Sequence, residues 1–245
     1  MKYYNLLTLI FLLALIQGCG TSSKTSSSEQ QQFNIDTYVD GTPFEIDVTS
    51  GKGHNHPTFV IWLEDVEGNF LKTIFITKSY ASGIYGHAAL TDSTWSNKSG
   101  QSYRPASLPY WSFKKGFIDG KFLIPEKEHP YVDGFTGATP KGDFSIESQL
   151  PKDGKYRILL EVNQTWDWNR YWTNNKYPDN RDYKSSAQPS AIYAVTVDIN
   201  DPMPFYIMNP IGHGQYAGED GRLYTDLSTM TTALEIFDRI EVKIK

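Results

Sequence analysis

An all-β fold is predicted by two features of this 245-residue sequence. Its apolar residues gather in short segments that alternate with polar residues or are rich in β-branched side chains, a pattern typical of strands and not of helices. The segments are separated by turns rich in Gly and Asp, residues that favour tight changes of chain direction. Together these features indicate a protein built from sheets.

In the first half of the chain, residues 44–48 (FEIDV) alternate apolar with polar and predict a half-buried strand. Residues 58–63 and 70–77 flank a polar connection and predict a hairpin. A shorter hairpin is predicted between residues 117–118 and 122–124, because the Asp-Gly pair between them suits the turns that match strand twist.

The second half of the chain adds four predicted strands, at residues 143–147, 156–162, 191–198 and 236–244. Seven main strands favour a two-sheet sandwich of immunoglobulin-like type, with a partly closed barrel as the alternative. Two long insertions separate the strands, at residues 78–110 and 163–189. Such long connections inside a domain are often functional.

The N-terminus predicts export and lipid anchoring. Residues 1–18 have one early Lys and a short apolar run, as a signal peptide does. The run ends at IQGC, which resembles the lipobox of bacterial lipoproteins, so Cys19 is the expected lipidation site and the cell envelope, periplasmic or surface-exposed, the expected location. Residues 19–32 are polar and predict a flexible tether. Residues 33–245 are expected to form one β-sandwich domain.

The charge of the chain argues against nucleic acid as a partner. The formal net charge is −5, and it becomes −6 without residues 1–18, which hold one Lys and no acidic residue. No basic run is present to contact phosphates.

The segment DGFTGATPKG, residues 133–142, presents a threonine after small residues. It resembles the acceptor motif at which a flavin transferase joins FMN through its phosphate to a threonine, which would be Thr139 here. Gly137 and Ala138 leave the hydroxyl accessible, and Gly134 and Gly137 allow a turn with positive φ. Under this resemblance the transferase recognises five residues, namely Asp133, Gly134, Thr136, Gly137 and Ala138. The alternative is a Gly-rich loop whose threonine only hydrogen-bonds within its own turn.

Aromatic residues cluster in the second insertion among Asn, Asp and Lys. The candidate ligand platform consists of Trp166, Trp168, Tyr171, Trp172 and Tyr177. Such rings can stack on the isoalloxazine of a tethered flavin or on a sugar. The third interpretation is that they only fix the insertion onto the sandwich by burial.

Motifs of a stand-alone enzyme are missing from the sequence. It has no Gly-x-Ser-x-Gly elbow, P-loop or Gly-x-Gly-x-x-Gly fingerprint, and its single Cys excludes a Cys-x-x-Cys-His haem site. The pair His54 and His56 lacks an identifiable third ligand, so no metal site is predicted. No catalytic residue is assigned.

Three stretches of the chain carry a further resemblance. They are FVIWLED at residues 59–65 with Gly68 and FLKT at 70–73; TGAT at 136–139 with Gly142; and the spaced residues Gly154, Tyr156 and Glu161. From about Phe44 onward the chain is similar to a family of uncharacterised predicted periplasmic proteins. The resemblance implies an immunoglobulin-type β module that takes part in flavin-dependent electron transfer.

The sequence therefore predicts an extracytoplasmic lipoprotein that carries FMN on Thr139 and passes electrons between partner proteins. Its expected partners are a flavin transferase, a membrane-bound redox protein and the membrane itself through Cys19. The alternative is a β-sandwich lipoprotein that binds carbohydrate or another envelope protein through its aromatic insertion. A purely structural lipoprotein is a third possibility.

Overall fold

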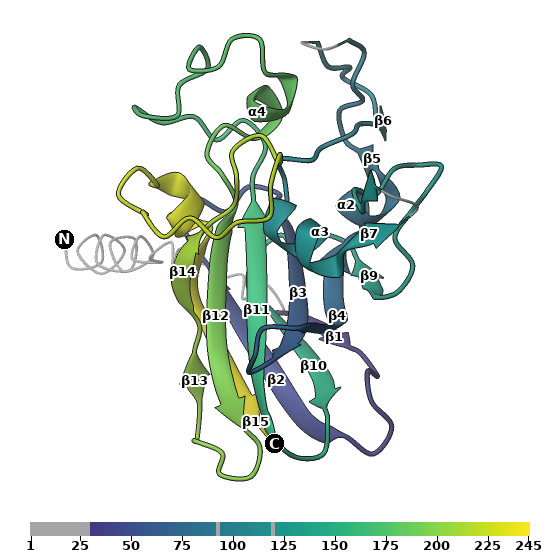
Figure 1. Ribbon diagram of the computed structural model, residues 1–245, viewed down its shortest axis with the longest axis vertical. Helices are drawn as coiled ribbons and strands as arrows, with labels where there is room; N and C mark the ends of the chain where they lie inside the picture. The colour runs from purple at the N-terminus through teal and green to yellow at the C-terminus, as the bar shows by residue number, and fades with distance from the viewer. Residues whose placement is uncertain (1–29, 92–93, 119–120) are drawn as a thin grey trace, which may run out of the picture.

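Two packed mixed sheets form the body of the protein (Figure 1). The structure is a computed structural model that describes residues 30–91, 94–118 and 121–245. The first sheet has the order β1-β10-β2-β15-β13, with bounds Gln31–Asn34, Phe144–Leu150, Thr42–Ser50, Phe237–Ile244 and Tyr206–Ile207. The second has the order β14-β12-β11-β3-β4-β9, with bounds Asn209–His213, Ala191–Asp198, Lys155–Asn163, Thr58–Asp65, Phe70–Thr77 and Phe135–Gly137. The predicted two-sheet sandwich is thus confirmed.

All seven predicted main strands are present, as β2, β3, β4, β10, β11, β12 and β15. These strands pair antiparallel, while the short strands β1 and β9 add parallel edges. In an immunoglobulin constant domain the sheets are ABED and CFG. Here the first sheet groups the fourth, first and seventh main strands, so the likeness to that fold is one of architecture and not of strand order.

Both long insertions carry short regular elements. The first contains helix α2 (Lys78–Ser82), the ribbon of β5 (Ile84–Tyr85) with β6 (Gly100–Gln101), and the start of helix α3 (Pro109–Lys115). The second contains helix α4 (Arg181–Ser186). In Figure 1 the segments marked by β5, β6 and α4 lie at the same end of the sandwich, opposite the C-terminus.

Two smaller elements complete the described chain. Strands β7 (Phe117–Ile118) and β8 (Lys121–Phe122) form the predicted short hairpin, whose turn lies outside the described residues. A 3₁₀ helix, η1 (Thr232–Glu235), precedes β15.

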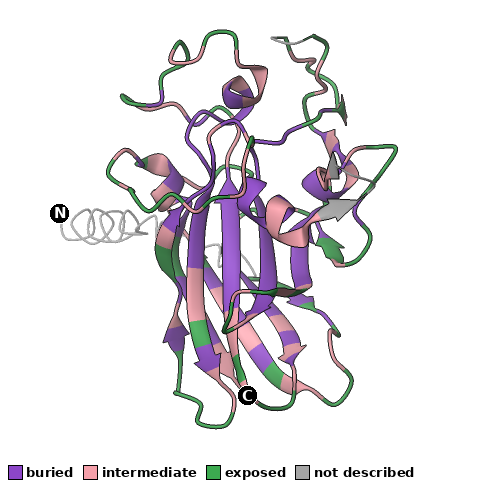
Figure 2. Ribbon diagram, viewed as in Figure 1, coloured by how far each residue is buried: buried purple, intermediate pink, exposed green. Residues whose placement is uncertain are grey.

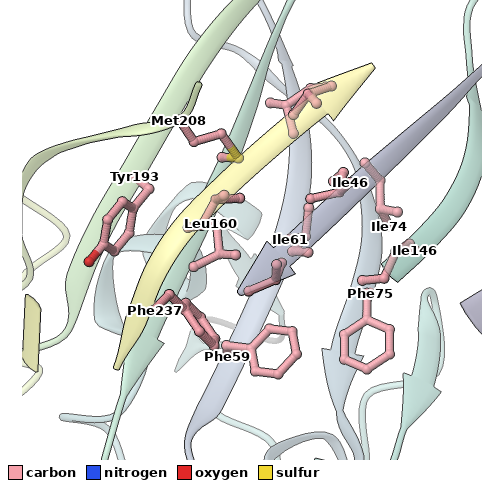
Figure 3. Close-up of a cluster of buried hydrophobic side chains, with 14 of the residues drawn as sticks. Ile46, Phe59, Ile61, Ile74, Phe75, Ile146, Leu160, Tyr193, Met208 and Phe237 are labelled. Carbon is pink, nitrogen blue, oxygen red and sulfur yellow. The ribbon is translucent and has the colours of Figure 1, made fainter. Parts of the chain in front are cut away.

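The core between the sheets is formed by the inward residues of the strands (Figure 3). Phe59 stacks on Phe75 and Phe144, with ring centroids 5.1 and 5.2 Å apart, and all three are fully buried. The alternation in β2 buries Phe44, Ile46 and Val48 against them, as period-two side-chain geometry requires.

Strand β3 is buried on both faces, because the outer face of the second sheet is covered as well (Figure 2). A second apolar cluster there joins Val60 and Trp62 of β3 to Tyr80 and Trp111 of helices α2 and α3. The first insertion is therefore packed onto the sheet and gains a fixed position from it.

The predicted signal peptide, the expected lipidation site Cys19 and the predicted tether up to residue 29 lie outside the described residues. Of the remaining tether, Gln31 and Gln32 belong to β1, which pairs with β10. Across residues 30–91, 94–118 and 121–245, no helix has the length and apolarity needed to cross a membrane.

Candidate functional site

The segment around Thr139 begins as an edge strand and not as a turn. Strand β9 pairs in parallel with β4, placing Thr136 opposite Ile76 and Gly137 opposite Thr77. Ala138 and Thr139 follow the strand and leave the ladder; Ala138 is exposed and Thr139 half-buried. The hydroxyl is thus presented at the end of a sheet edge, where a second protein can approach it.

Gly134 and Gly137 serve close packing, contrary to the expected positive φ. Neither is among the glycines with positive φ in the described chain. A Cβ added to Gly137 would lie 2.5 Å from Cε2 of Phe75, and one added to Gly134 would lie 3.0 Å from Cγ2 of Thr73. Small residues are needed here because β9 lies directly against β4 and the aromatic core.

Neighbouring segments hold the loop of residues 138–143 in place. The Thr139 hydroxyl donates to the Pro57 carbonyl at 3.3 Å, and Nε2 of His54 donates to the Pro140 carbonyl at 3.0 Å. Three residues further on, the Asp143 carboxylate accepts from the backbone N–H and hydroxyl of Ser50, and these bonds lower its pKa. The loop is thus anchored to the connection between β2 and β3.

Two of the polar motif residues, Asp133 and Thr136, are exposed to solvent. Asp133, at the other end of β9, is exposed and lies 3.4 Å from Nζ of Lys115. Thr136 is also exposed, in the middle of β9. Both are therefore accessible to a modifying enzyme.

Thr139 lines a cleft of about 460 Å³, a size typical of small-molecule sites. Its wall combines residues from both insertions with the loop before β3, including His56, Tyr85, His87, Arg104, Thr165 and Trp166. A second groove, of about 440 Å³, runs past Lys78, Ser82 and Ala138. Thr139 and Ser79 line both cavities, so the hydroxyl lies where they adjoin.

Trp166 supplies an aromatic face to this cleft. It is 37% exposed and lies in edge and tilted contact with Trp95 and His87, with ring centroids 5.6 and 5.4 Å apart. Trp166 and His56 both have positive φ, 59° and 54°, which non-glycine residues rarely adopt. Backbone strain of this kind gathers at functional sites.

The five predicted platform residues do not form one surface. Trp166 belongs to the Thr139 cleft, whereas Tyr171 and Trp172 line a separate pocket. Trp168 packs edge-on against Tyr183 and Tyr177 stacks on Tyr216, with ring centroids 6.0 and 4.2 Å apart. Part of the cluster therefore stabilises the insertion by packing, as one of the sequence-based interpretations held.

The separate pocket has a volume of about 380 Å³. Beside the half-exposed ring of Tyr171 it contains His213, Tyr216, Tyr224 and Asp226. The ring of Tyr224 stacks on that of His213 at 5.4 Å. We name it the Tyr171 pocket.

Sequence reasoning missed several residues of both cavities. His87 and Arg104 lie in the first insertion, whose length already indicated a functional role, but no local pattern distinguished them from their neighbours. The residues that complete the Tyr171 pocket come from the end of β14 and from the polar, aromatic connection between β14 and β15. The unusual length of the connection between β14 and β15 was the one feature of the sequence that could have indicated a functional role for these residues.

Within the part of the chain that the structure describes, no three His, Cys, Asp or Glu side chains gather as a metal site would require. Comparison of the chain with protein-family models, with curated proteins and with solved structures finds no match.

Proposed function

We propose that this protein is a lipid-anchored, extracytoplasmic electron carrier with FMN covalently attached to Thr139. The observation that carries the proposal is the position of the Thr139 hydroxyl, which lies outside the sheet ladder and lines a cleft that also contains the half-exposed ring of Trp166. The two features that the sequence suggested separately, a threonine acceptor and an aromatic face, therefore adjoin one cavity.

Attachment uses the Thr139 oxygen as a nucleophile once, during maturation. The oxygen attacks the flavin-side phosphorus of a flavin dinucleotide bound to the transferase, the phosphoanhydride bond breaks, and a nucleoside monophosphate leaves. The hydroxyl proton passes to a base of the transferase or to water. Ala138 next to Thr139, Thr136 in β9 and Asp133 before β9 are all exposed, so the transferase can contact them along the segment.

The residues present fit such a group. The cleft volume lies within the range of cofactor sites, and Trp166 and Tyr85 are aromatic walls. Arg104 provides a cationic group, and His56 and His87 provide hydrogen-bonding groups. When bound, the isoalloxazine supplies the redox chemistry, while the chain holds it in position and excludes water from one side. Electrons would pass between partner proteins, one of them a membrane-bound redox protein near the lipid on Cys19.

The test is the intact mass and visible absorbance of the full chain, exported in cells that contain a flavin transferase. The expected result is a mass increase of one FMN moiety and a yellow colour that survives denaturation. Thr139→Ala should abolish both. Ser79→Ala is the matched control, because Ser79 is the other hydroxyl that lines both cavities and is equally half-buried. It should leave the adduct unchanged.

An unmodified parent protein, in cells that modify a known acceptor, would refute the covalent attachment. An adduct that persists in Thr139→Ala would also refute the assignment of the site.

The Tyr171 pocket favours carbohydrate binding as a second candidate function. It places an exposed aromatic ring beside a carboxylate, Asp226, and an imidazole, His213, a combination that can stack on a sugar ring and bond its hydroxyls. Glycan-array binding of the full chain should then be lost in Tyr171→Ala. Tyr103→Ala is the control, because Tyr103 is 43% exposed outside this pocket. Equal glycan binding by both variants would remove the candidate.

A further inference from the structure

Arg104 is a buried cation of the Thr139 cleft. Only 3% of its surface is exposed. Its Nε donates to the Ser102 hydroxyl at 3.2 Å and its Nη1 to the Thr165 hydroxyl at 2.5 Å, and its guanidinium carbon lies 4.1 Å from the ring centroid of Tyr85. Because Tyr85 and Thr165 are themselves cleft residues, the guanidinium forms part of the cleft wall.

No carboxylate of the described residues forms an ion pair with Arg104. The ion pairs of arginine in those ranges involve other residues. A buried arginine usually has an acidic partner, because removing an ion from water is costly unless a counter-charge compensates. Burial lowers the pKa of Arg104, which reflects this unfavourable environment.

Part of the guanidinium remains available to a ligand. An arginine has five N–H groups, and the two hydroxyls accept from two of them. Within the described chain, the fully buried polar side-chain atoms without a hydrogen-bond partner belong to His54 and Asp167. Each nitrogen of Arg104 therefore either has a partner or keeps some accessible surface. Among the described residues Nη2 has no hydrogen-bond partner, so it keeps accessible surface and is the donor that can reach a ligand in the cleft.

The rest of the cleft lining matches an anion. Its described lining residues include His56, His87 and hydroxyls such as that of Thr139, with no Asp or Glu among them, and the adjoining groove adds Lys78. His87 donates from Nδ1 to the Ser96 carbonyl at 2.8 Å, which leaves its Nε2 free of that bond. This local composition contrasts with a chain whose net charge is −5.

We infer that the Thr139 cleft binds a phosphate group and that Arg104 is the residue that recognises it. Arginine presents paired N–H groups that match two oxygens of a phosphate, and a bound anion would neutralise the buried guanidinium. The inference deepens the proposed function, in which the phosphate is that of FMN, but it does not require covalent attachment. A free phosphate ester would be bound by the same groups.

The experiment uses the full chain produced without a flavin transferase, so that Thr139 is unmodified. FMN and riboflavin share one ring system and differ in the phosphate, which makes them matched probes. Quenching of flavin fluorescence should show FMN binding tighter than riboflavin by on the order of tenfold, as one charge-assisted contact predicts. Added salt should weaken FMN binding and leave riboflavin binding nearly unchanged.

Arg104→Gln should remove the preference for FMN over riboflavin. Because the substitution also removes an unpaired buried charge, the variant should unfold at the same temperature as the parent or higher in phosphate-free buffer, while losing the stabilisation that inorganic phosphate gives the parent. Arg104→Lys keeps the charge without the paired donors and should retain part of the preference. Arg170→Gln, which changes an exposed arginine, is the control and should behave as the parent.

Equal affinity of the parent for FMN and riboflavin would overturn the inference, and so would an unchanged preference in Arg104→Gln. These results are independent of the mass measurement on Thr139, so failure of flavinylation and failure of phosphate binding can be told apart. A flavinylated chain then identifies the source of the phosphate. Loss of the response to inorganic phosphate after flavinylation indicates the tethered FMN, and a persisting response indicates a separate phosphate ligand.

Discussion

Glu161 of strand β11 caps helix α3 through the backbone N–H of Trp111, which donates to Oε2 at 2.7 Å. Its Oε1 accepts from the N–H of Tyr110 at 3.1 Å and from the hydroxyl of Ser190 at 2.5 Å. The helix has no side-chain cap of its own, since Leu108 occupies the N-cap position, and no acidic residue in its first turn. A fully buried carboxylate from the sheet therefore replaces the local cap.

The first prediction concerns the pH dependence of stability. Burial raises the pKa of Glu161 from its ordinary value of 4.5 to about 7, against the effect of its hydrogen bonds. Between these values the folded protein binds more protons than the unfolded chain, so the Glu161 contribution to the free energy of unfolding decreases as pH rises through this window. The full shift corresponds to roughly 3 kcal/mol.

Urea denaturation of the parent and of Glu161→Gln measures this contribution at several pH values, from below the ordinary pKa of a glutamate to above the raised pKa of Glu161. The neutral amide of the variant should flatten the decrease. An identical pH dependence in both proteins would contradict the predicted titration of Glu161.

The second prediction separates two glycines of the acceptor segment. Gly137→Ala should destabilise the protein by about 1–3 kcal/mol, because its Cβ would overlap the ring of Phe75. Gly142→Ala is the matched control, since nothing lies within 4 Å of a Cβ added there and its φ is not positive. That substitution should change the midpoint of urea denaturation little or raise it. Equal effects of the two would argue against packing as the reason for Gly137.

The third prediction concerns Gln188, a buried side chain that joins the second insertion to the segment before β15. It accepts from the N–H of Thr231 at 2.7 Å and from Asn169 at 3.1 Å, and it donates to the Thr232 hydroxyl at 2.6 Å. Gln188→Ala removes these three hydrogen bonds at once and should cost about 2–3 kcal/mol of unfolding free energy.

Limited proteolysis gives the specific readout for Gln188→Ala, because release of the insertion should expose bonds within residues 163–189 before the sandwich is cut. Asn174→Ala, an exposed change in the same insertion, should be digested as the parent is. A variant with unaltered cleavage would show that Gln188 does not hold the insertion in place.

The fourth prediction tests the core between the sheets. Phe59→Ala removes a fully buried ring that packs against Phe75 and Phe144, and it should cost about 3–5 kcal/mol. Phe205 is 49% exposed, so Phe205→Ala should cost much less in the same thermal or urea measurement. A small effect of Phe59→Ala would indicate that the two sheets are not packed as described.

The main strands could be predicted from the sequence because their signal is local. Residues 44–48 alternate apolar with polar because one face of β2 is buried. Strands β3, β4 and β12 contain β-branched or apolar runs because consecutive residues, on both faces, are buried in part of each strand. Each pattern can be recognised within its own segment. Thr139 was also identifiable, since a small-residue motif is read along the chain. Pairing and strand order were not, because they depend on contacts between distant segments.

Only the tertiary structure showed which residues surround Thr139 and why glycine is needed at positions 134 and 137 before it. Strand β9 joins the sheet edge through pairing with β4, more than fifty residues earlier, so Gly137 is required by the ring of Phe75 and not by a turn. Arg104 and Trp166 reach the same cleft from separate insertions. The sequence by itself determined the strands and the acceptor candidate. The cleft arose from the packing of both insertions onto one end of the sandwich, because only folding brings these distant side chains together.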